Sequence, residues 1–146
     1  MESSALSSHY GSLASKTAVP WWAEDHVTDH VADMVEKYLD LKSTSRLVDI
    51  GAGSGSFASL LWTRAGLTNP VTCVEPSQQM LDLGANTPGL NPVCQGAEEW
   101  ASADSVYGEV DRVLIKYAVH HFDRKRMSET FKGIRYVTLN EHSRTL

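Results

Sequence analysis

The sequence lacks the features that mark several special classes of protein. Only two of its 146 residues are cysteine and five are proline, which excludes a disulfide scaffold and a proline-rich or collagen-like chain. No apolar run approaches the roughly 20 residues that a membrane-spanning helix needs. Basic residues number 13 against 18 acidic ones, which disfavours nucleic acid as the main ligand. The hydrophobic content of 42% is ordinary for a folded soluble domain with its own core.

The cysteines and the two ends of the chain carry weaker signals. Cys73 and Cys94 both lie in apolar, strand-like runs, and we interpret them as reduced core residues rather than a disulfide pair. Reduced cysteines indicate a reducing compartment, so we expect a cytoplasmic location. The serine-rich N-terminus has neither the arginines of a transit peptide nor the apolar core of a secretory signal. We expect residues 1–17 to form a mobile tail, residues 18–139 the folded domain and residues 140–146 a C-terminal tail.

Short apolar runs alternate with helical stretches after a first helix that follows Pro20. The predicted strands are 47–50, 70–75, 92–94 and 110–118, and the predicted helices are about 54–62, 77–83, 98–103 and 123–132. Residues 133–139 are expected to form at most one more strand. This alternation is typical of right-handed βαβ units. It predicts an α/β fold with a Rossmann-like doubly wound sheet, mostly parallel and incomplete, of about four or five strands. The ligand of such a sheet lies at the carboxyl ends of the strands.

A glycine-rich loop joins the first predicted strand of this sheet to the helix that follows. The loop is Gly51-Ala52-Gly53-Ser54-Gly55, and Asp49 precedes it. Glycine allows positive φ and lets a ligand approach the bare backbone. Glu75 closes the next predicted strand about 24 residues after Gly51, where a carboxylate accepts hydrogen bonds from the vicinal hydroxyls of a ribose. The loop and the acid together predict a ligand that contains adenosine.

Two classes of adenosine ligand compete for this loop. A dinucleotide-binding loop has glycine or alanine at its third motif position, where this sequence has Ser56. Asp49 is the only charged residue between Leu47 and Leu61, and a carboxylate without a cation is poorly suited to a pyrophosphate. Asp49 suits a positively charged ligand such as S-adenosylmethionine, which carries a sulfonium and an ammonium group. A nicotinamide-dependent oxidoreductase is the alternative with the same layout.

Three segments resemble motifs of the class I S-adenosylmethionine-dependent methyltransferases, in particular the small-molecule, type 11-like subgroup. LVDIGAGSGSFA is similar to the first motif of that family and VTCVEPSQQML to the second. DRVLIKYAVHHF is similar to its fourth-strand motif, which often ends in paired histidines. The resemblance covers about residues 22–131. It implies S-adenosylmethionine as the cofactor and methyl transfer to a small-molecule acceptor.

The resemblance also implies roles for individual residues. Asp49 would hold the amino group of the ligand, and Glu75 would hold the ribose hydroxyls. The loop backbone would pass beneath the methionine part and the ribose at Gly51, Ala52, Gly53 and Gly55. The adenine contacts would come from Pro76, Met80, Ala97 and Glu98. The methionine side of the ligand would be lined by Lys116 and Tyr117.

The sequence departs from the family pattern in two places. Gly96 stands where the family has an acid before the alanine, so Glu98 or the backbone would have to replace that acceptor for adenine. The family sheet has seven strands, whereas this sequence ends soon after the fourth, which leads us to expect a truncated or alternatively spliced product. Its fourth strand would then be an edge or near-edge strand and favour self-association. A truncated, non-catalytic ligand-binding or interaction module is therefore a further alternative function.

Histidines are the remaining candidates for chemistry. His120 and His121 are candidate general bases if the methyl acceptor must lose a proton, because imidazole titrates near neutral pH. The other interpretation is that this pair packs against its loop and hydrogen-bonds it. His26 and His30 are four residues apart on the first helix, a spacing that can bind a metal. No third ligand is evident, so a solvated polar face is favoured and no metal site is predicted.

Overall fold

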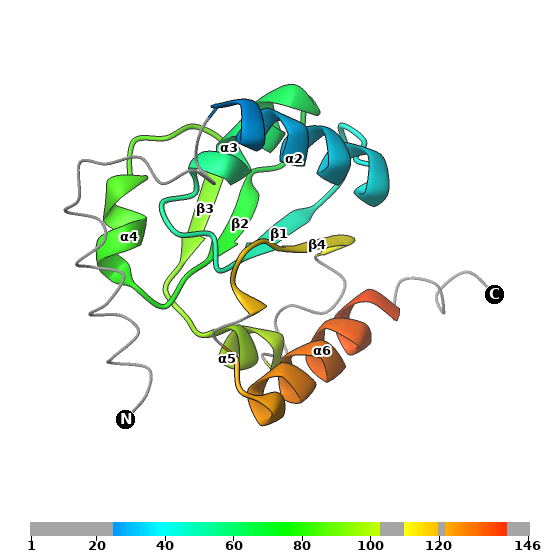
Figure 1. The fold of residues 1–146 in the computed structure, drawn as a ribbon, viewed down its shortest axis with the longest axis vertical. Helices are drawn as coiled ribbons and strands as arrows, with labels where there is room; N and C mark the ends of the chain where they lie inside the picture. The colour runs from blue at the N-terminus through cyan, green and yellow to red at the C-terminus, as the bar shows by residue number, and fades with distance from the viewer. Residues whose placement is uncertain (1–24, 103–109, 120–121, 140–146) are drawn as a thin grey trace.

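In the part of the chain that the structure describes, four short strands form one parallel sheet in the order β3-β2-β1-β4 (Figure 1). The computed structural model describes residues 25–102, 110–119 and 122–139. The strands are β1 (Leu47–Ile50), β2 (Val71–Val74), β3 (Leu90–Val93) and β4 (Arg112–Ile115). All three pairings are parallel, so the carboxyl ends of the strands meet at one edge. The predicted Rossmann-like α/β fold is confirmed.

The helices of the described residues are α2 (Asp25–Leu39), α3 (Ser56–Arg64), α4 (Gln78–Leu83), α5 (Ala97–Ser102) and α6 (Arg124–Leu139). Of these, α2 and α3 pack on one face of this sheet and α5 and α6 on the other, whereas α4 lies at the edge beyond β3 (Figure 1). Side chains alternate between the faces along a strand. Leu47 accordingly joins the cluster formed with α2 and α3, whereas Val48 and Ile50 join the cluster formed with α5. None of the described helices is long and apolar enough to cross a membrane.

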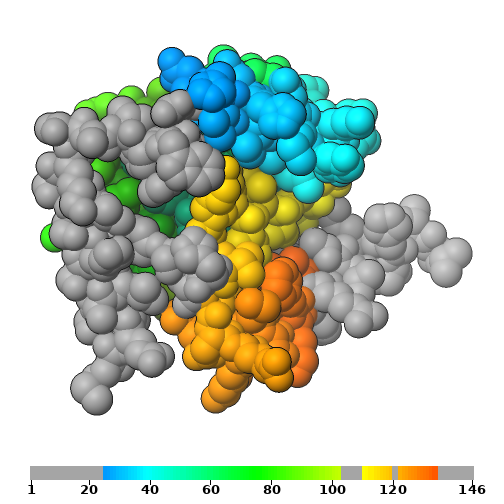
Figure 2. Space-filling view, in the orientation of Figure 1, coloured from blue at the N-terminus to red at the C-terminus, as the bar shows by residue number. Residues whose placement is uncertain are grey.

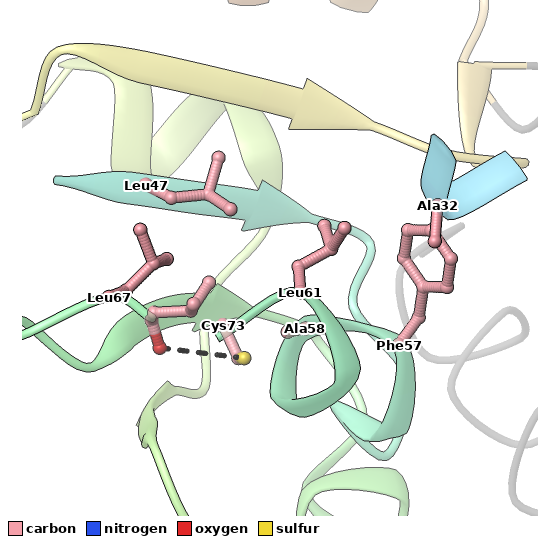
Figure 3. Close-up of a cluster of buried hydrophobic side chains, with 8 residues drawn as sticks. Ala32, Leu47, Phe57, Ala58, Leu61, Leu67 and Cys73 are labelled. Carbon is pink, nitrogen blue, oxygen red and sulfur yellow. Dashed lines mark hydrogen bonds between the residues drawn. The ribbon is translucent and has the colours of Figure 1, made fainter. Parts of the chain in front are cut away.

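The core on the α2 and α3 side is closely packed and apolar. Figure 3 shows side chains from α2, β1, α3 and β2 converging there. Its buried members are Ala32, Leu47, Phe57, Ala58, Leu61, Leu67, Val71 and Cys73. Burying a large aliphatic or aromatic side chain contributes about 1.5–3 kcal/mol. This core therefore fixes α3, whose first residues follow the glycine loop, rigidly on the sheet.

The opposite face depends on a close contact between α5 and α6. A Cβ atom at Gly133 would lie 2.5 Å from the carbonyl oxygen of Ala101, so only glycine lets the two helices approach this closely. Residues 133–139, for which at most one more strand was expected, form none: they belong to α6, and Gly133 serves there as a packing position. The helix predicted to end near Lys132 extends to Leu139.

The third strand and its cysteine differ from the prediction. β3 begins at Leu90 and ends at Val93, so Cys94 lies beyond the strand and is exposed. Its interpretation as a core residue is wrong, whereas Cys73 is buried as expected and both cysteines are free. Pro92 has no N–H to donate, and its place in β3, which is an edge strand, accommodates this.

At the other edge, β4 lies between α2 and α6 in the surface view (Figure 2). All four of its residues are partly exposed. In the sheet that the structure describes, β4 is bonded to β1 alone, as the prediction of an edge or near-edge strand requires.

Candidate ligand-binding site

The strand order creates a switch point between β1 and β4. From β1 the chain adds β2 and β3 on one side and then returns to add β4 on the other. Loops that leave adjacent strands in opposite directions open a crevice at the carboxyl edge, and ligands of such sheets bind there. The loop Gly51–Gly55 leaves β1 at this point, and Lys116 follows β4 beside it.

The glycine loop is held in one conformation by its own backbone and by β2. The N–H of Gly51 donates to the carbonyl oxygen of Val74 at 2.8 Å, and that of Gly55 donates to Ala52 at 3.0 Å. Gly51 has a φ of 75°, and a Cβ atom there would lie 2.4 Å from Cβ of Ala118. Gly53 has a φ of 60°, and its Cβ position is 3.4 Å from Cε of Met80. The loop therefore requires glycine both for its backbone and for close packing.

Glu75 closes β2 and binds the loop directly. One carboxylate oxygen accepts a hydrogen bond from the N–H of Gly53 at 3.1 Å, and the other accepts from Ser77 at 2.9 Å. Burial raises the pKa of Glu75, while these two N–H donors oppose the shift. Each carboxylate oxygen has a second lone pair. Glu75 can thus hold the loop and still accept two hydrogen bonds from a ligand.

Asp49 lies beneath the loop, 1% exposed. Its Oδ1 has no hydrogen-bond partner among the described residues. Burial is the largest cause that raises the pKa of Asp49; the charge of Lys116 opposes it and the charge of Glu75 adds to it, so that the pKa is about 7. A buried carboxylate oxygen without a donor is rare in proteins and costly. A hydrogen-bond donor or a cation beside Oδ1 would satisfy this oxygen.

Lys116 brings a cation to the crevice. Its Nζ atom lies 4.6 Å from the ring centroid of Phe57 and 4.5 Å from that of Tyr117. Burial lowers the pKa of Lys116, and Asp49 counteracts this shift. The prediction that no cation lies near Asp49 is therefore wrong for the folded protein. It holds only for the loop sequence between Leu47 and Leu61. Phe57, on the first turn of α3, was missed as a site residue because its helical position reads as core.

Glu98 lies beside Gly96, the position at which the sequence departs from the family motif. Its carboxylate atoms are 3.6–3.8 Å from the position that a Cβ of Gly96 would take. One oxygen accepts from Nε of Arg126 at 2.8 Å, and the other is buried without a partner among the described residues. The side chain of Glu98 thus fills the space beside Gly96, as an acid at position 96 would.

The other predicted site residues differ in how far they are exposed. Pro76 is exposed, Met80 is half-buried over the loop, and Tyr117 is 46% exposed with a φ of 58°. Ala97 is buried in the core beside Trp100, so only its backbone can reach a ligand. His120 and His121 lie outside the described residues, as do the expected tails 1–17 and 140–146.

The described residues contain no metal-binding cluster, and a second hollow lies away from the glycine loop. Among the described residues, no group of three or more histidine, cysteine, aspartate or glutamate side chains is placed to hold a metal. A hollow of about 240 Å³ lies at the opposite end of the strands, lined by Arg46, Leu47, Asn69, Pro70, Thr72 and Val110. It contains neither carboxylate of the crevice. The glycine loop remains the stronger candidate because charged side chains converge there on backbone that carries no Cβ atoms at Gly51, Gly53 and Gly55.

Comparison with known proteins identifies the family. The family model described as "Methyltransferase domain" matches residues 47–140, which include the loop, Glu75 and Lys116. The chain belongs to this methyltransferase domain family. No curated protein matches the sequence.

Solved methyltransferases share the fold. A protein of Anabaena variabilis assigned to an antibiotic biosynthesis pathway is 28% identical over 75% of this chain and 41% of its own, with a TM-score of 0.62. An S-adenosylmethionine-dependent methyltransferase of Archaeoglobus fulgidus is 25% identical over 76% and 48%, with a TM-score of 0.57. One from Leishmania major is 19% identical over 93% and 56%, with a TM-score of 0.71. The chain thus spans about half the length of these methyltransferases.

Proposed function

We propose that this methyltransferase domain binds S-adenosylmethionine in the crevice between β1 and β4 and transfers its methyl group to a small-molecule acceptor. The observation that carries the proposal is the partnerless buried Oδ1 of Asp49 beneath the glycine loop. The ammonium of the ligand would supply the missing donor. Several solved methyltransferases of this fold are complexes with S-adenosylhomocysteine, the product of the reaction.

The other residues of the crevice complement the remaining parts of this ligand. Glu75 would accept the two ribose hydroxyls on its free lone pairs. The backbone of Gly51–Gly55 would lie beneath the ribose and the methionine chain. Pro76, Met80, the backbone of Ala97 and the carboxylate of Glu98 would surround the adenine.

Methyl transfer requires little of the protein beyond positioning the acceptor against the methyl group. The sulfonium supplies an activated methyl group, so a bond forms between the acceptor nucleophile and the methyl carbon while the carbon–sulfur bond breaks. Alignment of the nucleophile is then the main contribution of the protein. We propose His120 or His121 as the base for an acceptor that must lose a proton. The acceptor is a small molecule in this proposal.

The competing dinucleotide is disfavoured by charge. Asp49 and Glu75 place two carboxylates at the crevice against one ammonium, that of Lys116. A pyrophosphate would add two negative charges near them. Ser56 also occupies the third motif position, where a dinucleotide loop has glycine or alanine.

Thermal unfolding of the full chain with S-adenosylhomocysteine or with NAD⁺ tests the proposal. At a hundredfold excess over Kd, the favoured ligand adds about 2.7 kcal/mol, which raises Tm by roughly 5–10 °C for a domain of this size. We expect the shift with S-adenosylhomocysteine and none with NAD⁺. Transfer of a radiolabelled methyl group to a small-molecule panel then tests turnover. A shift with NAD⁺ alone would contradict the assignment.

The proposal also covers the location, the self-association and the bounds of the domain. The free cysteines support a reducing, cytoplasmic location. The edge position of β4 supports self-association, which sedimentation would detect as a mass that rises with concentration. The folded domain would span residues 18–139, without nucleic acid as a ligand.

A further inference from the structure

Lys116 is partly buried, which is unusual for a lysine, and its ammonium lies beside two aromatic rings. Ile115 pairs with Ile50 in the sheet, so Lys116 enters the crevice beside the glycine loop. Its Nζ lies 4.6 Å from the ring centroid of Phe57 and 4.5 Å from that of Tyr117. No carboxylate oxygen of the described residues lies within 4.0 Å of this atom. Aromatic rings stabilise a cation here without satisfying its charge as a carboxylate would.

Asp49 and Lys116 present opposite charges on the same face of the sheet. Asp49 and Leu114 are register partners, and Lys116 follows Leu114 by two residues, so alternation directs both side chains to the α3 side. The contact of Lys116 with Phe57 of α3 agrees with this direction. One carboxylate oxygen and one ammonium, neither paired with the other at contact distance, therefore face the same crevice.

The first turn of α3 adds a third feature beside Lys116. Its N-cap is Gly55, which has no side chain to accept from the N–H groups of that turn. Free N–H groups at a helix N-terminus attract an anion. Phe57 belongs to this turn and touches Lys116, so the helix end and the ammonium favour negative charge at the same place.

We propose that Lys116 binds the carboxylate of the amino-acid end of the ligand, so that Asp49 and Lys116 together recognise a zwitterionic α-amino acid group. This inference rests on the proposed function and adds to it the group that distinguishes the amino-acid end from a simple amine. An α-amino acid carries its ammonium and carboxylate on one carbon, as the paired charges of the crevice require. A ligand that carries an amine but no carboxylate would make no ionic contact with Lys116.

A different role for Lys116 makes a different prediction. If Lys116 served only as a counter-ion that keeps Asp49 ionised, its removal would raise the pKa of Asp49 and weaken every ligand that carries the ammonium by the same factor, with or without a carboxylate. If Lys116 binds the carboxylate, its removal weakens S-adenosylhomocysteine more than the decarboxylated analogue.

Isothermal titration of three ligands separates these roles. They are S-adenosylhomocysteine, its decarboxylated analogue, which keeps the amine, and 5′-methylthioadenosine, which has neither group. A charge-assisted hydrogen bond accounts for roughly a ten- to hundredfold change in affinity. We expect Lys116→Met to weaken S-adenosylhomocysteine by that factor relative to the decarboxylated analogue and to leave 5′-methylthioadenosine unchanged. Lys116→Arg should retain most of the affinity. Lys132→Met is the matched control, because Lys132 is an exposed lysine of α6.

Each outcome has one meaning for the proposal. Unchanged or stronger binding of S-adenosylhomocysteine by Lys116→Met would overturn it. An equal loss for S-adenosylhomocysteine and its decarboxylated analogue would also overturn it, because Lys116 would then act only through Asp49, and an equal loss for all three ligands would indicate a structural role. Circular dichroism of the variant confirms that it is folded. Failure of the unmodified chain to bind S-adenosylhomocysteine would instead overturn the proposed function itself.

Discussion

The carboxylate of Glu75 and the backbone N–H of Gly53 are joined by a hydrogen bond of 3.1 Å. This bond connects the end of β2 to the loop that leaves β1. The second oxygen of the same carboxylate accepts from Ser77 at the start of α4. Glu75 therefore fixes both loops of the candidate site, and the direction of its free lone pairs is set before any ligand arrives. Such preorganisation lowers the entropic cost of binding.

Replacing Glu75 with alanine should weaken ligand binding strongly. The change removes two charge-assisted hydrogen bonds to the ribose, which corresponds to about 2–4 kcal/mol of binding free energy. Titration calorimetry with S-adenosylhomocysteine measures this loss. Asp82→Ala on α4, where Asp82 is exposed, is the control and should bind normally. An unchanged affinity of Glu75→Ala would count against the ribose contact.

Alanine at Gly51 should destabilise the fold more than alanine at Gly66. Both positions have positive φ, of 75° and 60°, so both substitutions bear the cost of a left-handed backbone, about 1–2 kcal/mol. Gly66 has open space around its Cβ position, whereas that of Gly51 is 2.4 Å from Ala118. Overpacking adds roughly 1–3 kcal/mol at Gly51 alone.

Urea unfolding of the two variants measures the difference between these costs. Gly66→Ala reports the backbone term, and the excess loss in Gly51→Ala reports the contact with Ala118. Equal losses would mean that the end of β4 can move away from the loop, and the close packing at the switch point would then be of no consequence for stability.

The sequence predicts those parts of the fold that depend on local pattern. β1 occupies the predicted residues, and Ser77 caps α4 by accepting from the N–H of Met80, as a serine before a helix commonly does. Gly133 was misread because glycine usually ends a helix. Here the requirement comes from Ala101 on another helix, a contact between segments distant in the sequence.

The same distinction applies to the site. Asp49, Glu75 and the loop glycines are recognisable because each lies at a strand end in a fixed local order. The cation near Asp49 comes from Lys116, 67 positions further along the chain, and only the pairing of β1 with β4 brings it there. Likewise, Glu98 fills the space beside Gly96 by folding back toward it, which depends on its rotamer and on Arg126.

Arg126 should hold Glu98 in this position and link α6 to the site. The Nε atom of Arg126 lies 2.8 Å from Oε1 of Glu98, and both side chains are mostly buried. A double-mutant cycle with Glu98→Gln and Arg126→Gln, followed by urea unfolding, should give a coupling energy of about 0.5–2 kcal/mol. The pair Lys125 and Glu129 is exposed and should show a smaller coupling. Equal coupling in the two pairs would contradict the structural role of Glu98.

Replacing Asp49 with asparagine should stabilise the ligand-free protein while weakening its binding. Burial raises the pKa of Asp49 from 3.8 to about 7, so the folded protein keeps a proton that the unfolded chain releases near pH 4. The free energy of unfolding therefore falls as pH rises from about 4 to 7. An asparagine side chain has no such proton to lose, so the advantage of Asp49→Asn should grow over this range to at most roughly 4 kcal/mol at pH 8.

Urea unfolding and ligand titration between pH 4 and 8 test both sides of this trade-off. Glu75 also has a raised pKa, so a part of the slope should survive in Asp49→Asn. The affinity of the unmodified protein for S-adenosylhomocysteine should rise with pH up to about 7, because the ammonium of the ligand requires ionised Asp49, and that of Asp49→Asn should stay low and flat. Asp82→Asn should match the unmodified protein throughout. If Asp49→Asn kept the full slope and the full affinity, Asp49 would be neither the buried acid nor the ammonium site.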